Sequence, residues 1–474
     1  MTEIKDLEPK ILWKYFDEIL KIPRCSKHEE KIAQYVMEVA KKHGLEVTQD
    51  KVGNVIARKK ASPGYENKPM VTLQCHLDMV CEKNKDVEHD FSKDAIKAYV
   101  DGDFVRAKGT TLGADDGIGV AACLAMMESD VEHPPLEFLF TVDEETGMTG
   151  AFNLEKEYIK GEVLINLDSE EFGSIYIGCA GGANSDIWLP LSFEEGGKGL
   201  KISVKGLRGG HSGVEIHKGR ANSIKLLARL LYNIGARIGH IEGGDKFNAI
   251  PREAFATVVV EDIEEAKKKI RELEEAFKDE YKRSDPDVKV EIEETNVEKV
   301  ISKELNEKVI KMLMGLPHGV IAMSQEVEGL VETSTNLAKV EMDDKLHIVM
   351  SSRSSIDSAL DAIMQTIRSI AELAGSKVEE GSRYPGWKPN RDSKLLKIAE
   401  ETFKKLYGKE PEIKAIHAGL ETGVIGRNVG IDEMISIGPD IEHPHSPDEN
   451  VRISSVQKFW KYLEALIKDI AEKW

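Results

Sequence analysis

Three short apolar runs in the first part of the chain constrain its fold more than any other feature. They are VTLQC (71–75), LEFLFTV (136–142) and EVLINLD (162–168), and polar or acidic residues end or follow each of them. Short runs without polar alternation are typical of strands that are buried on both faces of a sheet. The segment GIGVAACLAMMES, between the first two runs, is apolar nearly all round and predicts a buried helix. This order favours an α/β sheet with helices on its faces, where ligands bind at the carboxyl ends of the strands.

The pattern changes in the middle of the chain. Alternating segments such as LKISVKG and EAFATVVVE occur there with charged amphipathic helices, which is typical of an antiparallel sheet with helices on one face. Patterns of the first kind resume after PGWKPN. A chain of 474 residues is also too long for one hydrophobic core. We therefore predict an α/β domain, with a central mixed sheet flanked by helices, from residues 1–186 and 389–474, interrupted by an inserted α+β domain at 187–388.

The composition excludes some classes of function. A formal net charge of −19 argues against nucleic acid and anionic membranes as partners, because their phosphates would be repelled. The N-terminal segment MTEIKDLEPKILWKYFDEIL lacks the basic start and apolar core of a signal peptide, and no apolar run reaches transmembrane length. We therefore expect a cytoplasmic location. The five cysteines include no CxxC pair, so we expect neither disulfides nor a thiolate metal site.

Histidine and acidic residues follow the apolar runs. His76 and Asp78 lie two positions apart after the first run, so both side chains point to one side and Asp78 can orient the imidazole for metal binding. A structural histidine is the alternative. Asp115 and Asp116 stand where the buried helix begins. A helix cap accounts for one aspartate, but burying two is costly unless a cation or amide donors neutralise them.

The remaining chemical residues lie at other strand ends and near the C-terminus. Three carboxylates at 143–145 follow the second run, and such neighbours raise one another's pKa unless a metal compensates them. Asp168 ends the third run, and the Pro-rich loop HPHSPDENV offers His443 and His445. Each motif alone also fits an ordinary acidic loop. Together they supply nitrogen and oxygen ligands without sulfur, which favours zinc, manganese or cobalt.

Seven motifs, taken in order, resemble those of the aminoacyl-histidine dipeptidases. They are HLDMV, GADDGIGVAACLAM, DEETGMTGA, LDSEE, GLRGGHSGVEIHKGRAN, HAGLETG and HPHSPDENV. The resemblance runs from about residue 7 to the C-terminus and points to cytosolic members of the co-catalytic zinc family that also contains aminoacylases and carnosinases. It implies a zinc-peptidase-like catalytic domain with an inserted lid, and two divalent metal ions, zinc above all, with manganese or cobalt as alternatives.

The resemblance also implies roles for individual residues. It implies five metal ligands, His76, Asp115, Glu145, Asp168 and His445. Asp115 is the residue that bridges the two ions, Glu144 the general base that activates the bridging water, and Asp78 the partner of the histidine ligand. His445 is preferred over His443 because it directly precedes SPDE.

The substrate is expected to be a small peptide held partly by the inserted domain. His211, in GGHSG, matches the family residue that stabilises the oxyanion, and in relatives with short lids a dimer partner supplies it, so a homodimer stays open. Arg353 is the candidate clamp for the substrate carboxylate, with a surface arginine as the alternative. We expect Asn248 and Gly419 to line the pocket and Glu421 to meet the free amine.

The resemblance implies a metal-dependent dipeptidase that hydrolyses unblocked dipeptides, including those that end in histidine. An aminoacylase or another amidohydrolase with the same two-metal site is the alternative within enzymes. A metal-binding or peptide-binding protein without activity is the alternative outside them. Glu144 speaks against the last hypothesis, because a protein that only binds needs no general base.

Overall fold

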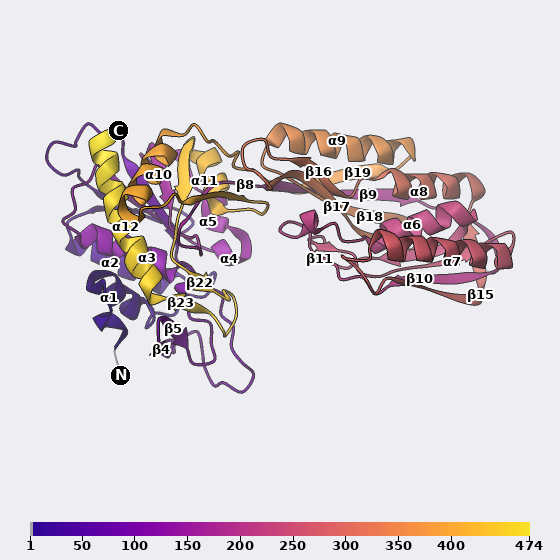
Figure 1. The fold of residues 1–474 in the computed structure, drawn as a ribbon, viewed down its shortest axis with the longest axis horizontal. Helices are drawn as coiled ribbons and strands as arrows, with labels where there is room; N and C mark the ends of the chain where they lie inside the picture. The colour runs from indigo at the N-terminus through magenta and orange to yellow at the C-terminus, as the bar shows by residue number, and fades with distance from the viewer. Residues whose placement is uncertain (1–2) are drawn as a thin grey trace. The chain divides into compact units, whose positions relative to one another are not determined.

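The computed structural model describes residues 3–474, which divide into two compact units. The first unit consists of Met1–Gly178, Pro389–Ala415 and Leu420–Trp474. The second consists of Cys179–Lys388 and Ile416–Gly419. The chain therefore leaves the first unit, forms the second and returns, as Figure 1 shows by its colours.

An eight-stranded mixed sheet forms the centre of the first unit, in the order β1-β2-β6-β3-β7-β21-β8-β20. The strands are β1 (Glu46–Gln49), β2 (Val55–Lys59), β3 (Val71–His76), β6 (Leu136–Thr141), β7 (Val163–Asn166), β8 (Ser174–Cys179), β20 (Glu412–Ile416) and β21 (Glu433–Ser436). The three apolar runs of the sequence are β3, β6 and β7, which are adjacent, mutually parallel and buried throughout. Their carboxyl ends therefore share one edge of the sheet.

Helices cover this sheet. They are α1 (Lys10–Ile19), α2 (Glu30–Lys42), α3 (Ala114–Glu128), α4 (Glu144–Gly147), α5 (Thr149–Phe152), α10 (Lys394–Tyr407), α11 (Glu421–Val429) and α12 (Ile453–Lys473). Helix α3 is the predicted buried helix, and it is buried from its first residue to Met127 because it packs between α1 and β3. A smaller sheet pairs β22 (Ile441–Glu442), β23 (Asn450–Arg452), β5 (Phe104–Ala107) and β4 (Ala98–Asp101) in that order.

The second unit is built on a nine-stranded sheet whose central order is β15-β10-β14-β12-β17-β18-β9-β19, with β16 on β17. The strands are β9 (Gly181–Pro190), β10 (Phe193–Lys205), β12 (Arg237–Gly243), β14 (Ala254–Val259), β15 (Lys289–Ile301), β16 (Gly319–Met323), β17 (Val331–Met342), β18 (Lys345–Ser354) and β19 (Lys377–Tyr384). Neighbouring strands pair antiparallel, as the alternating sequence predicts.

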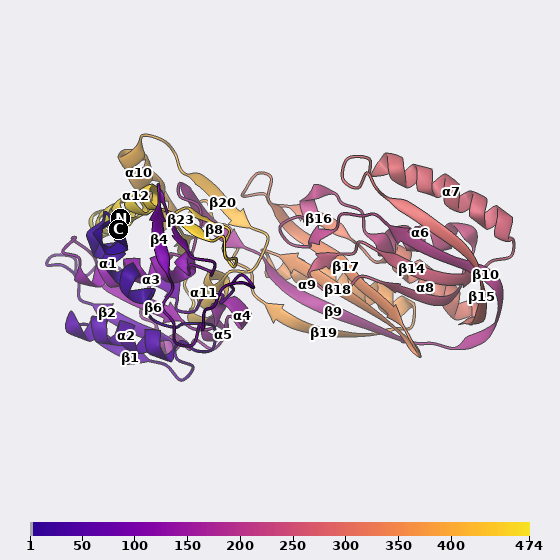
Figure 2. The ribbon, with the colours of Figure 1, turned by 90° about the horizontal axis from the view of Figure 1, so that it is seen from below.

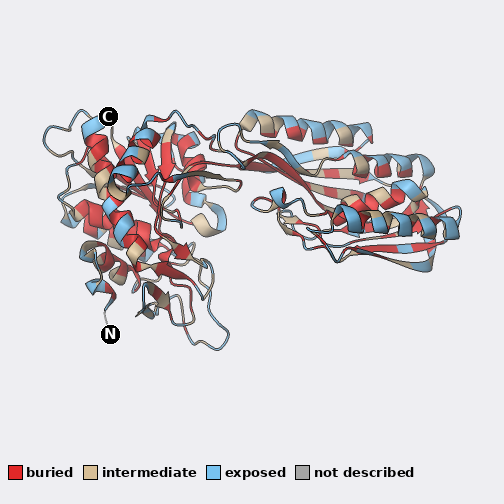
Figure 3. Cartoon of the chain, viewed as in Figure 1, coloured by how far each residue is buried: buried red, intermediate tan, exposed pale blue. Residues whose placement is uncertain are grey.

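Four helices pack along the second sheet, as Figures 1 and 2 show. They are α6 (Ser223–Ile234), α7 (Ile263–Glu280), α8 (Lys303–Gly315) and α9 (Asp357–Leu373). Their apolar faces share one core with the sheet, so buried residues concentrate between the helices and the strands (Figure 3). The α/β fold with an α+β insertion is therefore confirmed.

A disulfide joins Cys25 and Cys81, whose Cα atoms are 5.7 Å apart. The expectation that the chain forms no disulfide was wrong. The two cysteines lie 56 positions apart, so no short spacing in the sequence indicates the pair, and only folding brings them together. Within residues 3–474, no helix is both long enough and apolar enough to cross a bilayer.

Candidate metal centre and active site

The predicted metal ligands of the first unit meet at the carboxyl edge of its sheet. His76 is the last residue of β3, Glu145 lies in the short helix that follows β6, and Asp168 follows β7. Asp115 lies at the start of α3, and His445 comes from the loop between β22 and β23. Because the three strands are parallel, their ends deliver these side chains to one place.

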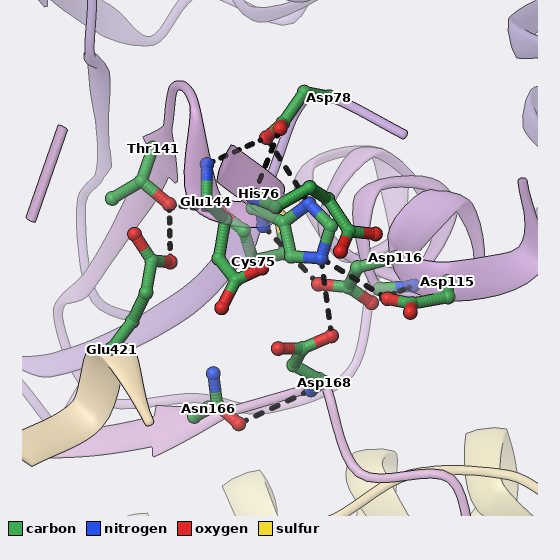
Figure 4. Close-up of polar contacts among 12 residues, drawn as sticks. Cys75, His76, Asp78, Asp115, Asp116, Thr141, Glu144, Asn166, Asp168 and Glu421 are labelled. Carbon is green, nitrogen blue, oxygen red and sulfur yellow. Dashed lines mark hydrogen bonds and ion pairs between the residues drawn. The ribbon is translucent and has the colours of Figure 1, made fainter. Parts of the chain in front are cut away.

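The first ligand group contains His76, Asp115 and Asp168. The Nε2 atom of His76 lies 3.1 Å from Oδ1 of Asp115 and 3.4 Å from Oδ1 of Asp168. Figure 4 shows the three functional groups facing one another. Burial raises the pKa of Asp168 to about 7, against the opposing effect of His76, and repulsion by Asp115 raises it further.

The second ligand group contains Asp115, Glu145 and His445. The Nε2 atom of His445 lies 3.1 Å from Oδ2 of Asp115 and 3.0 Å from Oε2 of Glu145. Asp115 therefore directs one carboxylate oxygen to each histidine. Among the described residues, His443 belongs to no cluster of this kind, so the geometry favours His445.

The residues present fit a pair of divalent cations. Oε1 of Glu145 is buried and has no hydrogen-bond partner in the protein, so this oxygen lacks a donor. Within each group the ligand atoms lie within 4.8 Å of one another, close enough to share one ion. Buried carboxylates that crowd in this way repel one another, and only positive charge compensates them. The donors are nitrogen and oxygen, which suits zinc and its neighbours in the first transition row.

Asp78 supports the cluster from behind. Its Oδ1 lies 3.3 Å from Nδ1 of His76, and its two oxygens accept the backbone N–H groups of Glu144 and Glu145 at 3.0 Å and 3.2 Å. The hydroxyl of Ser26 donates to it at 2.8 Å. Although burial opposes ionisation, His76, then the hydroxyl of Ser26 and the backbone N–H of Glu144, lower the pKa of Asp78 to about 2. The carboxylate therefore fixes the imidazole and the start of α4 together.

Glu144 lies beside the ligands on α4, and with His76 and Glu145 it forms a further cluster. Burial raises the pKa of its carboxyl group well above the usual value, and repulsion by Asp168 and Glu421 adds to this against the opposing effect of His76. A carboxylate with a raised pKa accepts a proton more readily at neutral pH, as a general base must.

Asp116 has a structural role that the sequence left open. Its Oδ2 accepts the backbone N–H of His76 at 3.2 Å, and its Oδ1 accepts that of Gly119 at 3.1 Å. Amide donors therefore stabilise the carboxylate of Asp116, although burial and repulsion by Asp168 raise its pKa, whereas the oxygens of Asp115 face histidines. The peptide bond between the two is cis.

Glu421, expected to meet a substrate amine, is 2% exposed at the start of α11. Its Oε2 accepts from Oγ1 of Thr141 at 2.6 Å, as Figure 4 shows. The same oxygen accepts from Nε2 of Gln74 at 2.9 Å. Oε1 has no hydrogen-bond partner in the protein. Any contact with an amine therefore depends on Oε1.

His211 lies on the two-residue strand β11 (Gly210–His211) of the second unit. Its Nδ1 accepts the backbone N–H groups of Gly213 at 3.1 Å and Val214 at 3.3 Å. The proton of the neutral ring then lies on Nε2, which can donate. Burial and the charge of Arg353 both lower the pKa of His211, so the ring stays neutral.

Arg353 is only 8% exposed, so it is not an ordinary surface arginine. Its Nη1 donates to the hydroxyl of Tyr384 at 2.9 Å, and its Nε has no partner in the protein. Gly419 borders the same tyrosine, because a Cβ atom at Gly419 would lie 2.9 Å from the ring. Asn248 accepts the backbone N–H of Ser212 through its carbonyl, beside His211.

The sequence reading did not assign roles to Glu449, Arg24 and Tyr384. Glu449 stands in the SPDEN motif after His445, and this was the only signal for it. Arg24 and Tyr384 carry no motif of their own. All three act through contacts with the backbone or with another side chain, which sequence spacing does not indicate.

Comparisons with known proteins show the family of the chain. Residues 72–469 match the model of peptidase family M20/M25/M40. The chain is 43% identical to the cytosol non-specific dipeptidase of Escherichia coli over the whole of both proteins. The crystal structure of the aminoacylhistidine dipeptidase of Vibrio alginolyticus is also 43% identical, with a TM-score of 0.94 over 98% of each chain. The aminopeptidase PepT of Bacillus cereus, 18% identical with a TM-score of 0.58 over 98% of this chain and 99% of that one, shares the fold. The chain belongs to peptidase family M20/M25/M40.

Proposed function

We propose that the chain is a metal-dependent dipeptidase that hydrolyses small dipeptides with a free amine, including those that end in histidine. One observation carries the proposal: the two oxygens of Asp115 each face a histidine and stand beside a further carboxylate. This is the arrangement of a ligand that bridges two cations. The relatives from E. coli and V. alginolyticus are named as dipeptidases, and the E. coli protein is named as a cytosol dipeptidase. The names support the substrate class and a cytoplasmic location.

Two divalent cations, zinc in preference to manganese or cobalt, are the cofactor in this proposal. Two sets of side chains would hold them, His76 with Asp168 and Glu145 with His445, and Asp115 belongs to both sets. When bound, such a pair of ions lowers the pKa of water and polarises a carbonyl oxygen.

Glu144 moves the proton in this proposal. Its carboxylate takes a proton from the attacking water and returns it to the nitrogen of the leaving amine. Asp78 keeps Glu144 in place, because it accepts the backbone N–H of that residue while it orients His76. A pKa above the usual carboxyl value brings the group closer to neutral pH, where it can accept the proton from water and then return it to the amine.

The second unit supplies residues that bind the substrate. We assign the oxyanion to His211, because its Nε2–H is free of the backbone contacts that occupy Nδ1. Arg353 is the partner for the terminal carboxylate, since a guanidinium matches that group in a bidentate contact. Asn248 and Gly419 line the pocket in the same assignment. A homodimer, in which one chain offers this histidine to the other, is the alternative to action within one chain.

The test compares wild type with Glu144→Gln, which removes the base but keeps the shape of the side chain. We expect the metal content to stay the same while turnover of a dipeptide falls by about a hundredfold to ten-thousandfold. Glu157→Gln, at an exposed residue, is the control and should keep full turnover. Full activity in Glu144→Gln would remove the proposed base. An N-acyl amino acid that is hydrolysed faster than the dipeptide would identify an aminoacylase instead.

A further inference from the structure

Glu449 accepts four backbone hydrogen bonds at the start of α3. Its Oε2 accepts the N–H groups of Leu112 at 2.7 Å and Gly113 at 2.9 Å. Its Oε1 accepts those of Ala114 at 2.8 Å and Asp115 at 3.2 Å. The residue is 2% exposed, so these donors replace water for its carboxylate. Both oxygens are fully used, which leaves neither of them to bind a cation.

The loop that Glu449 holds is the one that places Asp115. The N–H of Asp115 is itself one of the four donors, so a movement of the loop moves the carboxylate that faces both histidines. Metal ligands must stay within about half an ångström of their productive positions. A loop held by four hydrogen bonds from one carboxylate has little freedom to depart from that position.

Arg24 holds the same loop through one of its carbonyl groups. Its Nη2 donates to the carbonyl of Gly113, and its Nη1 donates to the carbonyls of Leu77 at 3.0 Å and Asp78 at 2.7 Å. Gly113 adopts a φ of 73°, and a Cβ atom there would lie 2.7 Å from Nη2 of Arg24. Glycine suits this position, because it adopts the left-handed backbone without strain and leaves room for the guanidinium. The arginine connects the loop to the segment that follows His76.

Glu449 also belongs to the loop that carries His445. Its N–H donates to the carbonyl of Ser446 at 3.0 Å, which closes a turn directly after that histidine. His445 and Asp115 lie 330 positions apart in the sequence. One side chain thus connects the segments that carry these two predicted ligands.

We propose that Glu449 is a positioning residue that fixes the bridging carboxylate of Asp115 relative to His445 and thereby sets the affinity of the metal centre. The proposal depends on the metal binding proposed above. It predicts that glutamine cannot replace Glu449. Each carboxylate oxygen accepts two N–H groups, so either orientation of the amide turns its NH₂ group toward two donors.

The test measures the affinity of metal-free protein for Zn²⁺ by competition with a chromogenic chelator. We expect Glu449→Gln and Glu449→Ala to bind Zn²⁺ about 10-fold to 100-fold more weakly than wild type, as loss of a residue that orients ligands does. Glu442→Gln is the matched control, because Glu442 is the last residue of β22, directly before the same loop, but pairs with Arg452. It should bind as wild type does. Circular dichroism of each metal-free variant checks that it folds.

Glu449→Asp tests the positioning role if the glutamine variant does not fold. Aspartate keeps the charge but is one methylene shorter, so it reaches fewer of the four donors, and the folded variant should bind Zn²⁺ more weakly than wild type. Equal affinity of wild type and a folded Glu449 variant would overturn the positioning role alone. Absence of Zn²⁺ binding by wild type would overturn the proposed function as well, so the two failures are distinguishable.

Discussion

Replacing Cys25 and Cys81 with serine removes the crosslink between the segment after α1 and the segment after β3. The crosslink stands next to residues that support the metal centre. Arg24 donates to the backbone at Asp78, and Ser26 donates to the Asp78 carboxylate. We therefore expect the double variant to lose stability in the first unit.

The size of this loss follows from the length of the loop that the disulfide closes. The two cysteines lie 56 positions apart, and the loss of chain entropy on closing such a loop corresponds to about 4 kcal/mol at 25 °C. For a unit of this size, each kcal/mol lowers the melting temperature by roughly 2–4 °C. The double variant should thus melt about 8–16 °C lower than wild type.

Calorimetry measures the melting temperature, and a thiol titration checks the premise. Denatured wild type should titrate with Ellman's reagent only at Cys75, Cys123 and Cys179, and at all five cysteines after reduction. Reduced wild type should have the same melting temperature as the double variant, since both lack the same crosslink. Five reactive thiols without reductant, or equal melting temperatures of oxidised wild type and the double variant, would refute the reasoning.

Two further predictions concern single side chains. Tyr384→Phe removes the hydroxyl that Arg353 contacts. A lost hydrogen bond of about 1 kcal/mol should raise KM for dipeptides about fivefold at similar kcat, as measured by steady-state kinetics. A fall in kcat with unchanged KM would contradict this expectation. His445→Asn should lose bound metal on dialysis, whereas His443→Asn should keep it, because Nε2 of His445 faces Asp115 and Glu145. Metal analysis with the opposite outcome would exchange the roles of the two histidines.

The central sheet is predictable from sequence because its strands have a local signature, and part of the ligand cluster follows from the sheet. The runs that form β3, β6 and β7 are apolar on both faces, and a fully buried strand requires that pattern. Their ends then meet at one edge, because parallel strands point the same way. His76 and Asp168 are brought together by this rule alone, without any knowledge of the contacts between them.

Other features have no local signature. The disulfide depends on a distant pair of cysteines, and Glu449 depends on backbone donors that any residue provides. Arg24 likewise binds carbonyl groups, so nothing in its own neighbourhood in the sequence indicates its role. The burial of Glu421 follows from its contacts with β3 and β6, which are equally invisible in the sequence around it.

The structure also separates carboxylates that the sequence cannot distinguish. Asp78, Asp116 and Glu449 accept backbone N–H groups, so protein donors stabilise their charge. Asp115 and Glu145 instead face histidine nitrogen atoms, and one oxygen of Glu145 has no donor at all. A buried carboxylate without protein donors is stable only if a cation supplies the missing interaction. The histidine nitrogen atoms that Asp115 and Glu145 face, together with the missing donor at Glu145, therefore identify both as candidate ligands, and the backbone donors of Asp78, Asp116 and Glu449 identify those three as supports.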